Sequence, residues 1–262
     1  MTSSLASFRA IPGAACCVGL LLILTFTACS KKVVTTAPGR IQVEPRTIVH
    51  EVAPGETLAL IADNYFGDPS RSHRIASDNG VSDPEQLLSG SILLLRFTEE
   101  EWQVAQRRAA AMKPYNRGVE FLEQERLEDA EREFGLALEL VPDLVSAQYN
   151  QALVDLKRGR NEAAEQRLAS LVALRPDDLD FLYSYGHVLF LEARFAEAVD
   201  IFAQLLGLDA QHRRGAFGWA RSLQEAGRAD EAILAWENYL TLDSSSRWAN
   251  QARQNLQELR GE

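Results

Sequence analysis

The stretch that decides the fold reads AMKPYNRGVEFLEQERLEDAEREFGLALELVPDL at residues 111–144 and VSAQYNQALVDLKRGRNEAAEQRLASLVALRPDD at residues 145–178. Two further copies of this 34-residue unit follow without a gap and end at Ser246. A small residue recurs with this period at Gly118, Ala152, Gly186 and Ala220. An alanine recurs with it at Ala130, Ala164, Ala198 and Ala232. A fixed period of this size predicts a stack of repeated units. The alternative is a non-repeating helical domain in which the period is accidental.

Each copy is expected to form two helices joined by a tight turn. In the second copy, the first helix is predicted from Ala147 to Lys157 and the second from Asn161 to Leu174. A large apolar residue follows each recurring alanine by four positions, at Phe134, Leu168, Phe202 and Trp236. Small side chains let two helices approach closely, and the large ones pack beneath the next copy, so the copies must stack. Pro142 and Pro176 end two of the second helices.

These small, aromatic and proline positions resemble the tetratricopeptide repeat. The resemblance implies a mostly α fold, a right-handed α-solenoid of four helix pairs within residues 114–246. The repeat register starts at residues 111, 145, 179 and 213. Residues 247–262 are expected to form a capping helix and tail, because one face of that helix is apolar and the other is polar. The apolar face contains Trp248, Ala252, Leu256 and Leu259.

In this family, certain positions of each first helix line a groove for a protein partner. The resemblance carries this role over to Tyr115, Tyr149, Leu153, Tyr183, His187, Phe190, Phe217 and Arg221. The same rings can instead pack between neighbouring helices, and both interpretations stay open. A grip on a terminal carboxylate is not expected, because its basic or amide positions are occupied by Tyr115, Val119, Asp180 and Ser184.

Residues 1–28 are predicted to be a secretory signal. Their apolar run, at residues 14–26, is shorter than the roughly 20 residues that span a bilayer. Phe26–Ser30 resembles the lipobox of bacterial lipoproteins, which implies that Cys29 is acylated and holds the protein in a membrane. Ser30 favours the outer membrane, with the protein facing the periplasm. The alternatives are cleavage after Ala28 without acylation, and an uncleaved anchor helix.

Residues 29–46 are polar and lack an apolar period, so we expect a flexible tether.

The charge and the cysteine content of the chain argue against several other classes of function. The formal net charge of −10 provides no attraction to nucleic acid. All three cysteines lie within the first 29 residues, which leaves none for a disulfide or a zinc site in the folded part.

Residues 47–97 are expected to form a small domain with the order β, α, α, β. Branched residues mark the first strand, Thr57 is a candidate helix cap, and residues 67–69 separate the two helices. The pattern resembles the lysin motif, which binds glycans that contain N-acetylglucosamine. The residues that carry the resemblance include Val52, Pro54, Ile61, Ala62, Tyr65, Phe66, Gly67, Asp68, Pro84, Gly90, Leu93 and Leu95. The ligand that the resemblance implies here is peptidoglycan.

The resemblance places the glycan contacts in a shallow groove between the turn after the first strand and the loop before the last. It carries this role over to Gly55, Glu56, Thr57, Leu58, Asn79, Gly80, Gln86 and Leu87. Structural roles are the alternative. Gly55 can serve the turn geometry, Thr57 can cap a helix, and Asn79 with Gly80 can end one.

Residues 98–113 are expected to form a connecting helix. The sequence from Thr98 to Glu101 matches a capping box at its start. Pro114 follows early in the first repeat, where it can kink the helix.

No catalytic site is predicted, and neither a metal nor a cofactor. The four histidines are scattered, and the chain has no glycine-rich phosphate loop and no His-Glu-x-x-His motif. The sequence therefore predicts a non-catalytic cell-envelope adaptor that binds peptidoglycan and an unidentified envelope protein. Two alternatives remain, a pilot or assembly chaperone lipoprotein for a secretion or pilus pore, and a structural tether between membrane and wall.

Overall fold

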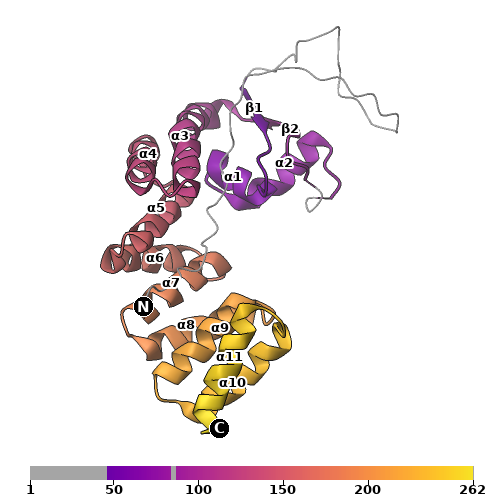
Figure 1. The fold of residues 1–262 in the computed structure, drawn as a ribbon. Helices are drawn as coiled ribbons and strands as arrows, with labels where there is room; N and C mark the ends of the chain where they lie inside the picture. The colour runs from indigo at the N-terminus through magenta and orange to yellow at the C-terminus, as the bar shows by residue number, and fades with distance from the viewer. Residues whose placement is uncertain (1–45, 84–86, 262) are drawn as a thin grey trace. The chain divides into compact units, whose positions relative to one another are not determined.

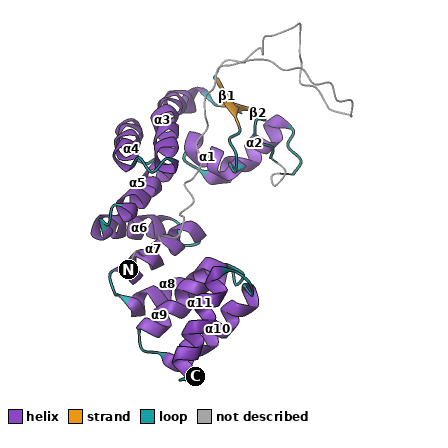
Figure 2. Ribbon diagram, in the orientation of Figure 1, coloured by secondary structure: helices purple, strands orange, loops and turns teal. Residues whose placement is uncertain are grey.

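The structure is a computed structural model that describes residues 46–83 and 87–261. The predicted signal segment, Cys29, the tether up to residue 45 and Gln86 lie outside the described residues. The described chain is mostly helical (Figure 2). It divides into two compact units between Asn150 and Gln151, inside a helix.

The first unit begins with a βααβ segment, which comprises residues 47–96 (Figure 1). Its elements are the strand β1 (Thr47–Glu51), the helices α1 (Leu58–Phe66) and α2 (Ser72–Asn79), and the strand β2 (Ile92–Arg96). The two strands pair in antiparallel orientation. The order of elements agrees with the expectation, with a short 3-10 helix, η1 (Pro69–Arg71), added between the two α-helices.

Local chemistry explains where α1 begins and ends. The side chain of Thr57 accepts a hydrogen bond from the backbone N–H of Leu60 at 3.1 Å, which confirms the predicted cap. Gly67 ends the helix with φ of 71°, a left-handed conformation that glycine adopts at low cost.

The long helix α3 (Glu99–Glu123) joins the βααβ segment to the repeats without a break. Its N-terminus carries the complete capping box that the sequence predicted, between Thr98 and Glu101. Pro114 lies inside this helix. Proline cannot donate to the carbonyl of Ala110, and Ala110 is exposed, so water can bond that carbonyl. The connecting helix and the first helix of the first copy are therefore one element.

Helix α3 packs against α4 (Leu127–Leu140), and the start of α5 (Val145–Lys157) completes the first unit. Gly118 lies directly against the ring of Phe134. A Cβ on Gly118 would come within 2.6 Å of that ring. The recurring small residue thus makes room for the large ring of its own copy.

The second unit continues the series of helix pairs. Its helices are α6 (Asn161–Leu174), α7 (Leu179–Leu191), α8 (Phe195–Leu208), α9 (Arg213–Glu225), α10 (Ala229–Leu242) and α11 (Arg247–Arg260). Each helix from α6 to α11 contacts the next one, and the first helices α7 and α9 also touch each other. Helix α11 follows the fourth pair where the capping helix was expected.

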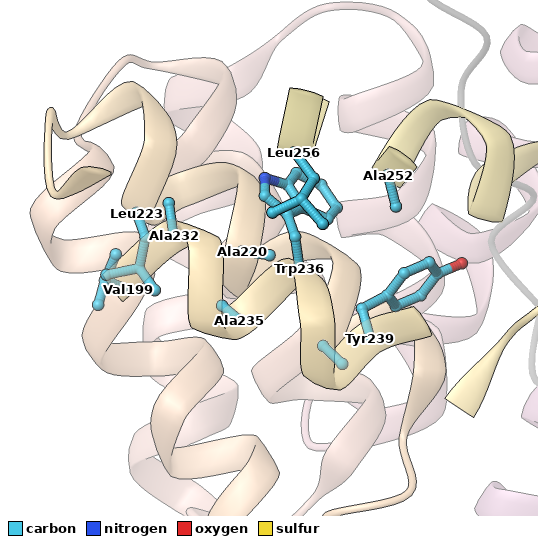
Figure 3. Packing of buried hydrophobic residues seen from close by; sticks show 10 residues of the cluster. Val199, Ala220, Leu223, Ala232, Ala235, Trp236, Tyr239, Ala252 and Leu256 are labelled. Atoms are coloured by element: carbon cyan, nitrogen blue, oxygen red, sulfur yellow. The ribbon is translucent and has the colours of Figure 1, made fainter. Parts of the chain in front are cut away.

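The core of the last copy surrounds Trp236, which is fully buried and donates from its Nε1 to Gln224 at 2.9 Å. Leu256 and Ala252 of α11 belong to the same cluster (Figure 3). The further buried members are Val199, Ala216, Ala220, Leu223, Ala232, Ala235 and Tyr239. Helix α11 therefore covers apolar surface that the last helix pair would otherwise expose.

The turn inside each copy repeats one backbone feature. A residue with positive φ occurs at Glu125 (58°), Gly159 (71°), Ala193 (58°) and Gly227 (74°), which are 34 residues apart. An arginine follows each of them and precedes the second helix, at Arg126, Arg160, Arg194 and Arg228. Only two of the four left-handed positions hold glycine, the residue that suits them.

Candidate binding surfaces

Glu56, a predicted glycan contact, lies inside the βααβ segment. Its Oε2 accepts hydrogen bonds from the Nε2 of His50 (2.8 Å) and from the backbone N–H of Ala53 (3.0 Å). The hydroxyl of Tyr65 lies 3.2 Å from the other ring nitrogen of His50. The side chains of His50 and Glu56 are each only 1% exposed. This carboxylate therefore holds the turn after β1 in place.

Two more of the predicted glycan residues have roles in the fold. Leu58 is buried. The side-chain amide of Asn79 donates to the carbonyls of Ile75 and Leu94, and its oxygen accepts from the N–H of Leu94 at 2.7 Å. Asn79 therefore joins the end of α2 to β2.

The remaining predicted glycan residues stay accessible. Gly55, Thr57 and Gly80 are exposed, and Leu87 is half-buried. The loop before β2 lies beside the turn after β1, since the backbone of Val52 bonds to the backbones of Gly90 and Ser91 at 2.8 and 2.9 Å.

Leu88 is 72% exposed, and it was not among the predicted glycan contacts. An exposed leucine can pack against the apolar face of a sugar ring. The accessible predicted glycan residues are thus Gly55 and Thr57 in the turn, Gly80 after α2, and Leu87 in the loop before β2.

In the first unit, the predicted partner-groove residues are buried. Tyr115 has no exposed surface and Tyr149 is 2% exposed. The hydroxyl of Tyr115 accepts a hydrogen bond from Asn150 at 3.2 Å. Burial chiefly, with the nearby negative charge of Glu56, raises the pKa of Tyr115 well above its usual value. For these two rings the structure favours the packing interpretation, as it does for the buried Leu153 at the start of the second unit.

In the second unit Tyr183 is also buried, but arginine side chains lie over two rings of its first helices. The guanidinium of Arg214 lies over the ring of Tyr183 at 4.7 Å, and that of Arg221 lies over the ring of Phe190 at 4.5 Å. His187 is half-buried, and its ring stacks against Tyr183. We call these five residues of α7 and α9 the Arg–aromatic face.

Charge on the Arg–aromatic face is positive. Burial, with the nearby charge of Arg221, lowers the pKa of His187 to about 4, so this ring is neutral at physiological pH. Arg214 has Asp180 at 3.9 Å, where both side chains are largely exposed. Arg221 is exposed, and no carboxylate within ion-pair distance of it is found among residues 46–83 and 87–261. Its guanidinium is available to an acidic group.

Phe217, the fourth ring of the predicted groove, mainly serves the core. It packs edge-on against Trp236, Tyr239 and Trp248 with ring centroids 5.0 to 5.2 Å apart. The structure thus brings Tyr183, His187, Phe190 and Arg221 together and adds Arg214, which the sequence interpretation omitted. The signal for Arg214 was available, because the residue lies one helical turn before Phe217 on the same helix.

The described chain was also compared with the requirements of a metal site and of a membrane-spanning helix, and it meets neither. In residues 46–83 and 87–261, no group of three or more His, Cys, Asp or Glu side chains is arranged to hold a metal ion. Within the same ranges, no helix combines the length and the apolar character that crossing a bilayer requires.

Comparison with known proteins identifies the repeats. A family model described as tetratricopeptide repeat matches residues 115–166 and again residues 149–213. A crystal structure of MamA protein is similar with a TM-score of 0.53 and 18% identity, over 58% of this chain and 82% of that one. A tetratricopeptide repeat protein from Parabacteroides merdae ATCC 43184 has a TM-score of 0.53 and 14% identity, over 58% of this chain and 61% of its own.

A second crystal structure of MamA covers 55% of this chain and 82% of its own, with 17% identity and a TM-score of 0.51. At such identities the likeness concerns the fold alone. No curated protein sequence matches the chain. The family model and the fold agree with the helix pairs observed here, and the match to tetratricopeptide repeats covers residues 115–213.

Proposed function

We propose that this protein is a non-catalytic cell-envelope adaptor. Its repeats hold a protein partner on the Arg–aromatic face, and its βααβ segment binds peptidoglycan through the turn and the loop that remain accessible. The acylated Cys29 holds the chain at the outer membrane.

The observation that carries the proposal is the Arg–aromatic face itself. Planar guanidinium groups bind carboxylates through two parallel hydrogen bonds, and aromatic rings supply large contact area at little cost in conformational entropy. Arg214 and Arg221 are already oriented by the rings beneath them, which reduces what they lose on binding. In a chain with a net charge of −10, this local positive charge favours an acidic segment of the partner.

Site-specific photocrosslinking in the native host tests partner binding. A photoreactive residue replaces Asp180 beside the Arg–aromatic face, and in a matched control it replaces the exposed Ala203 on the second helix α8. We expect a discrete adduct from position 180 that is absent at position 203 and is lost when Arg221→Glu is added. Equal adducts at both positions, or no effect of Arg221→Glu, would contradict a partner on this face.

Sedimentation with purified peptidoglycan sacculi tests the glycan role. We expect the chain to sediment with sacculi, and Leu88→Asp to reduce the bound fraction several-fold, since it places a charge in the accessible loop. Val49→Asp is the matched control, because Val49 is also an exposed apolar side chain of the same segment but lies on β1. Sedimentation that is unchanged by Leu88→Asp, or absent for the unmodified chain, would refute this role.

Cell fractionation with metabolic labelling by a fatty acid tests the anchor. The label should enter the wild-type chain and should be absent from Cys29→Ser, which should leave the outer-membrane fraction. A Cys29→Ser chain that stays in that fraction would point to an uncleaved anchor.

A further inference from the structure

Equivalent positions of the repeats differ sharply in exposure between the two units. Met112, Ser146, Asp180 and Arg214 occupy the same place in four successive copies, 34 residues apart. Met112 is 4% exposed and Ser146 is 1% exposed. The side chains of Asp180 and Arg214 are 54% and 40% exposed. The helix pairs have the same architecture. The difference in exposure therefore requires another part of the chain to cover this position in the first two copies.

The adjacent column of residues repeats the observation. Val119 of the first copy is 5% exposed, whereas His187 of the third copy is half-buried and Arg221 of the fourth is exposed. In this column the covered residue Val119 is apolar, and the exposed residue Arg221 is charged. The first helices of copies one and four therefore meet different surroundings.

In the first unit, helix α1 contacts α3. Ser146 of α5 donates a hydrogen bond of 2.7 Å to the side-chain oxygen of Asn64 on α1. Both residues are at most 1% exposed. Helix α1 therefore lies against Ser146, and it also contacts α3, the helix that carries Met112.

Arg108 of α3 also stabilises the contact between α1 and the repeats. Its guanidinium donates to the backbone carbonyl of Asp63 (3.4 Å) and to the carboxylate of Asp143 (2.5 Å). It also fills the space beside Gly67, where a Cβ would lie 2.7 Å from Nη2. A positive group at the C-terminal end of α1 is favourably placed against the helix dipole. An arginine that is only 5% exposed marks this as a built interface.

We infer that α1 is the resident occupant of the first-helix face of the first repeat, and that an external partner is thereby excluded from that face. The βααβ segment and the first repeat then form one interlocked body, and partner binding is left to the open face of α7 and α9. The inference goes beyond the proposed function, because it holds whether or not the segment binds glycan.

Thiol labelling at equivalent positions tests the occupancy. In the full chain with Cys16, Cys17 and Cys29 replaced by serine, single cysteines are introduced as Met112→Cys or as Arg214→Cys. We expect Arg214→Cys to react at the rate of an exposed thiol and Met112→Cys to react about 100-fold more slowly, since it must await local opening. Equal rates would overturn the inference. Val104→Cys, at an exposed position of α3, controls for general protection of that helix.

A second variant identifies what covers the position. Adding Asn64→Ala and Arg108→Ala to Met112→Cys weakens the contact with α1, and labelling should accelerate about tenfold or more. The rate at Arg214→Cys should not change. An unchanged rate at Met112→Cys would show that something other than α1 buries it. If the double change reduces helix content measured by circular dichroism, Asn64→Ala alone gives the same comparison.

Discussion

Ser146 donates a buried hydrogen bond to Asn64, a residue that precedes it by 82 positions. The bond joins the second tetratricopeptide copy to the first helix of the chain. Both residues are at most 1% exposed, so water cannot replace Ser146 as the donor to the oxygen of Asn64.

The first prediction concerns the hydrogen bond between Ser146 and Asn64. Ser146→Ala leaves the oxygen of Asn64 buried without that donor, which should lower the free energy of unfolding by about 1–3 kcal/mol. Urea denaturation of Ser146→Ala, Asn64→Ala and the double variant measures the coupling, expected to be at least about 0.5 kcal/mol. Strictly additive effects would mean that the two side chains do not interact.

A second prediction concerns Gly118. A methyl group there would meet the ring of Phe134, so Gly118→Ala should destabilise the first unit by about 1–3 kcal/mol. Gly207→Ala is the matched control, because this glycine lies in α8 with nothing near its Cβ position. There, alanine should instead stabilise the helix by about 0.5–1 kcal/mol. Thermal or urea unfolding distinguishes the two signs.

The repeated left-handed turns provide a third prediction. Ala193 has φ of 58°, a conformation that costs a residue with a Cβ about 1 kcal/mol. Ala193→Gly should therefore raise the free energy of unfolding by a few tenths to about 1 kcal/mol, after the greater freedom of glycine in the unfolded chain is included. The reverse change at the equivalent turn, Gly227→Ala, should lower it. A destabilised Ala193→Gly variant would disprove the argument.

The fourth prediction follows from His187. Its pKa falls from 6.5 to about 4 on folding, so the unfolded chain binds the proton more readily between these pH values. The free energy of unfolding should therefore be unaffected by this group above pH 6.5 and should fall as the pH is lowered from 6.5 to 4, by roughly 2–3 kcal/mol at most. His187→Gln should flatten this dependence in urea titrations across the window. Arg221→Gln should raise the lower end of the window and so reduce the total change, because it removes the second cause of the shift.

The periodicity of the sequence was sufficient to place the helix pairs. The second helix of the second copy was expected from Asn161 to Leu174, and the structure has it at those residues. Small residues, proline and capping positions act over a few residues, so their consequences can be read locally. The capping box at Thr98 and the cap at Thr57 were predicted for the same reason.

The surroundings of the predicted site residues could not be read in this way. Ser146 and Asp180 are equivalent in the sequence, yet Ser146 is buried against Asn64 of α1, which lies 82 residues away in the chain, while Asp180 is exposed. Glu56 looks like a surface acid in a turn, and its burial depends on which face of β1 His50 occupies. Neither relationship has a period or a local motif to reveal it.

The uninterrupted helix α3 restricts where further 34-residue copies could be inserted into the array of repeats. Helix α11 covers the last helix pair, and α1 occupies the first-helix face of the first copy, to which Arg108 joins it. A 34-residue insertion at the start of the first copy would carry Arg108 and α1 away from Ser146, whereas an insertion at residue 178 would leave both closures intact. Any lengthening of this protein over time is therefore expected to have occurred in the interior of the array, between two ends that cannot be exchanged.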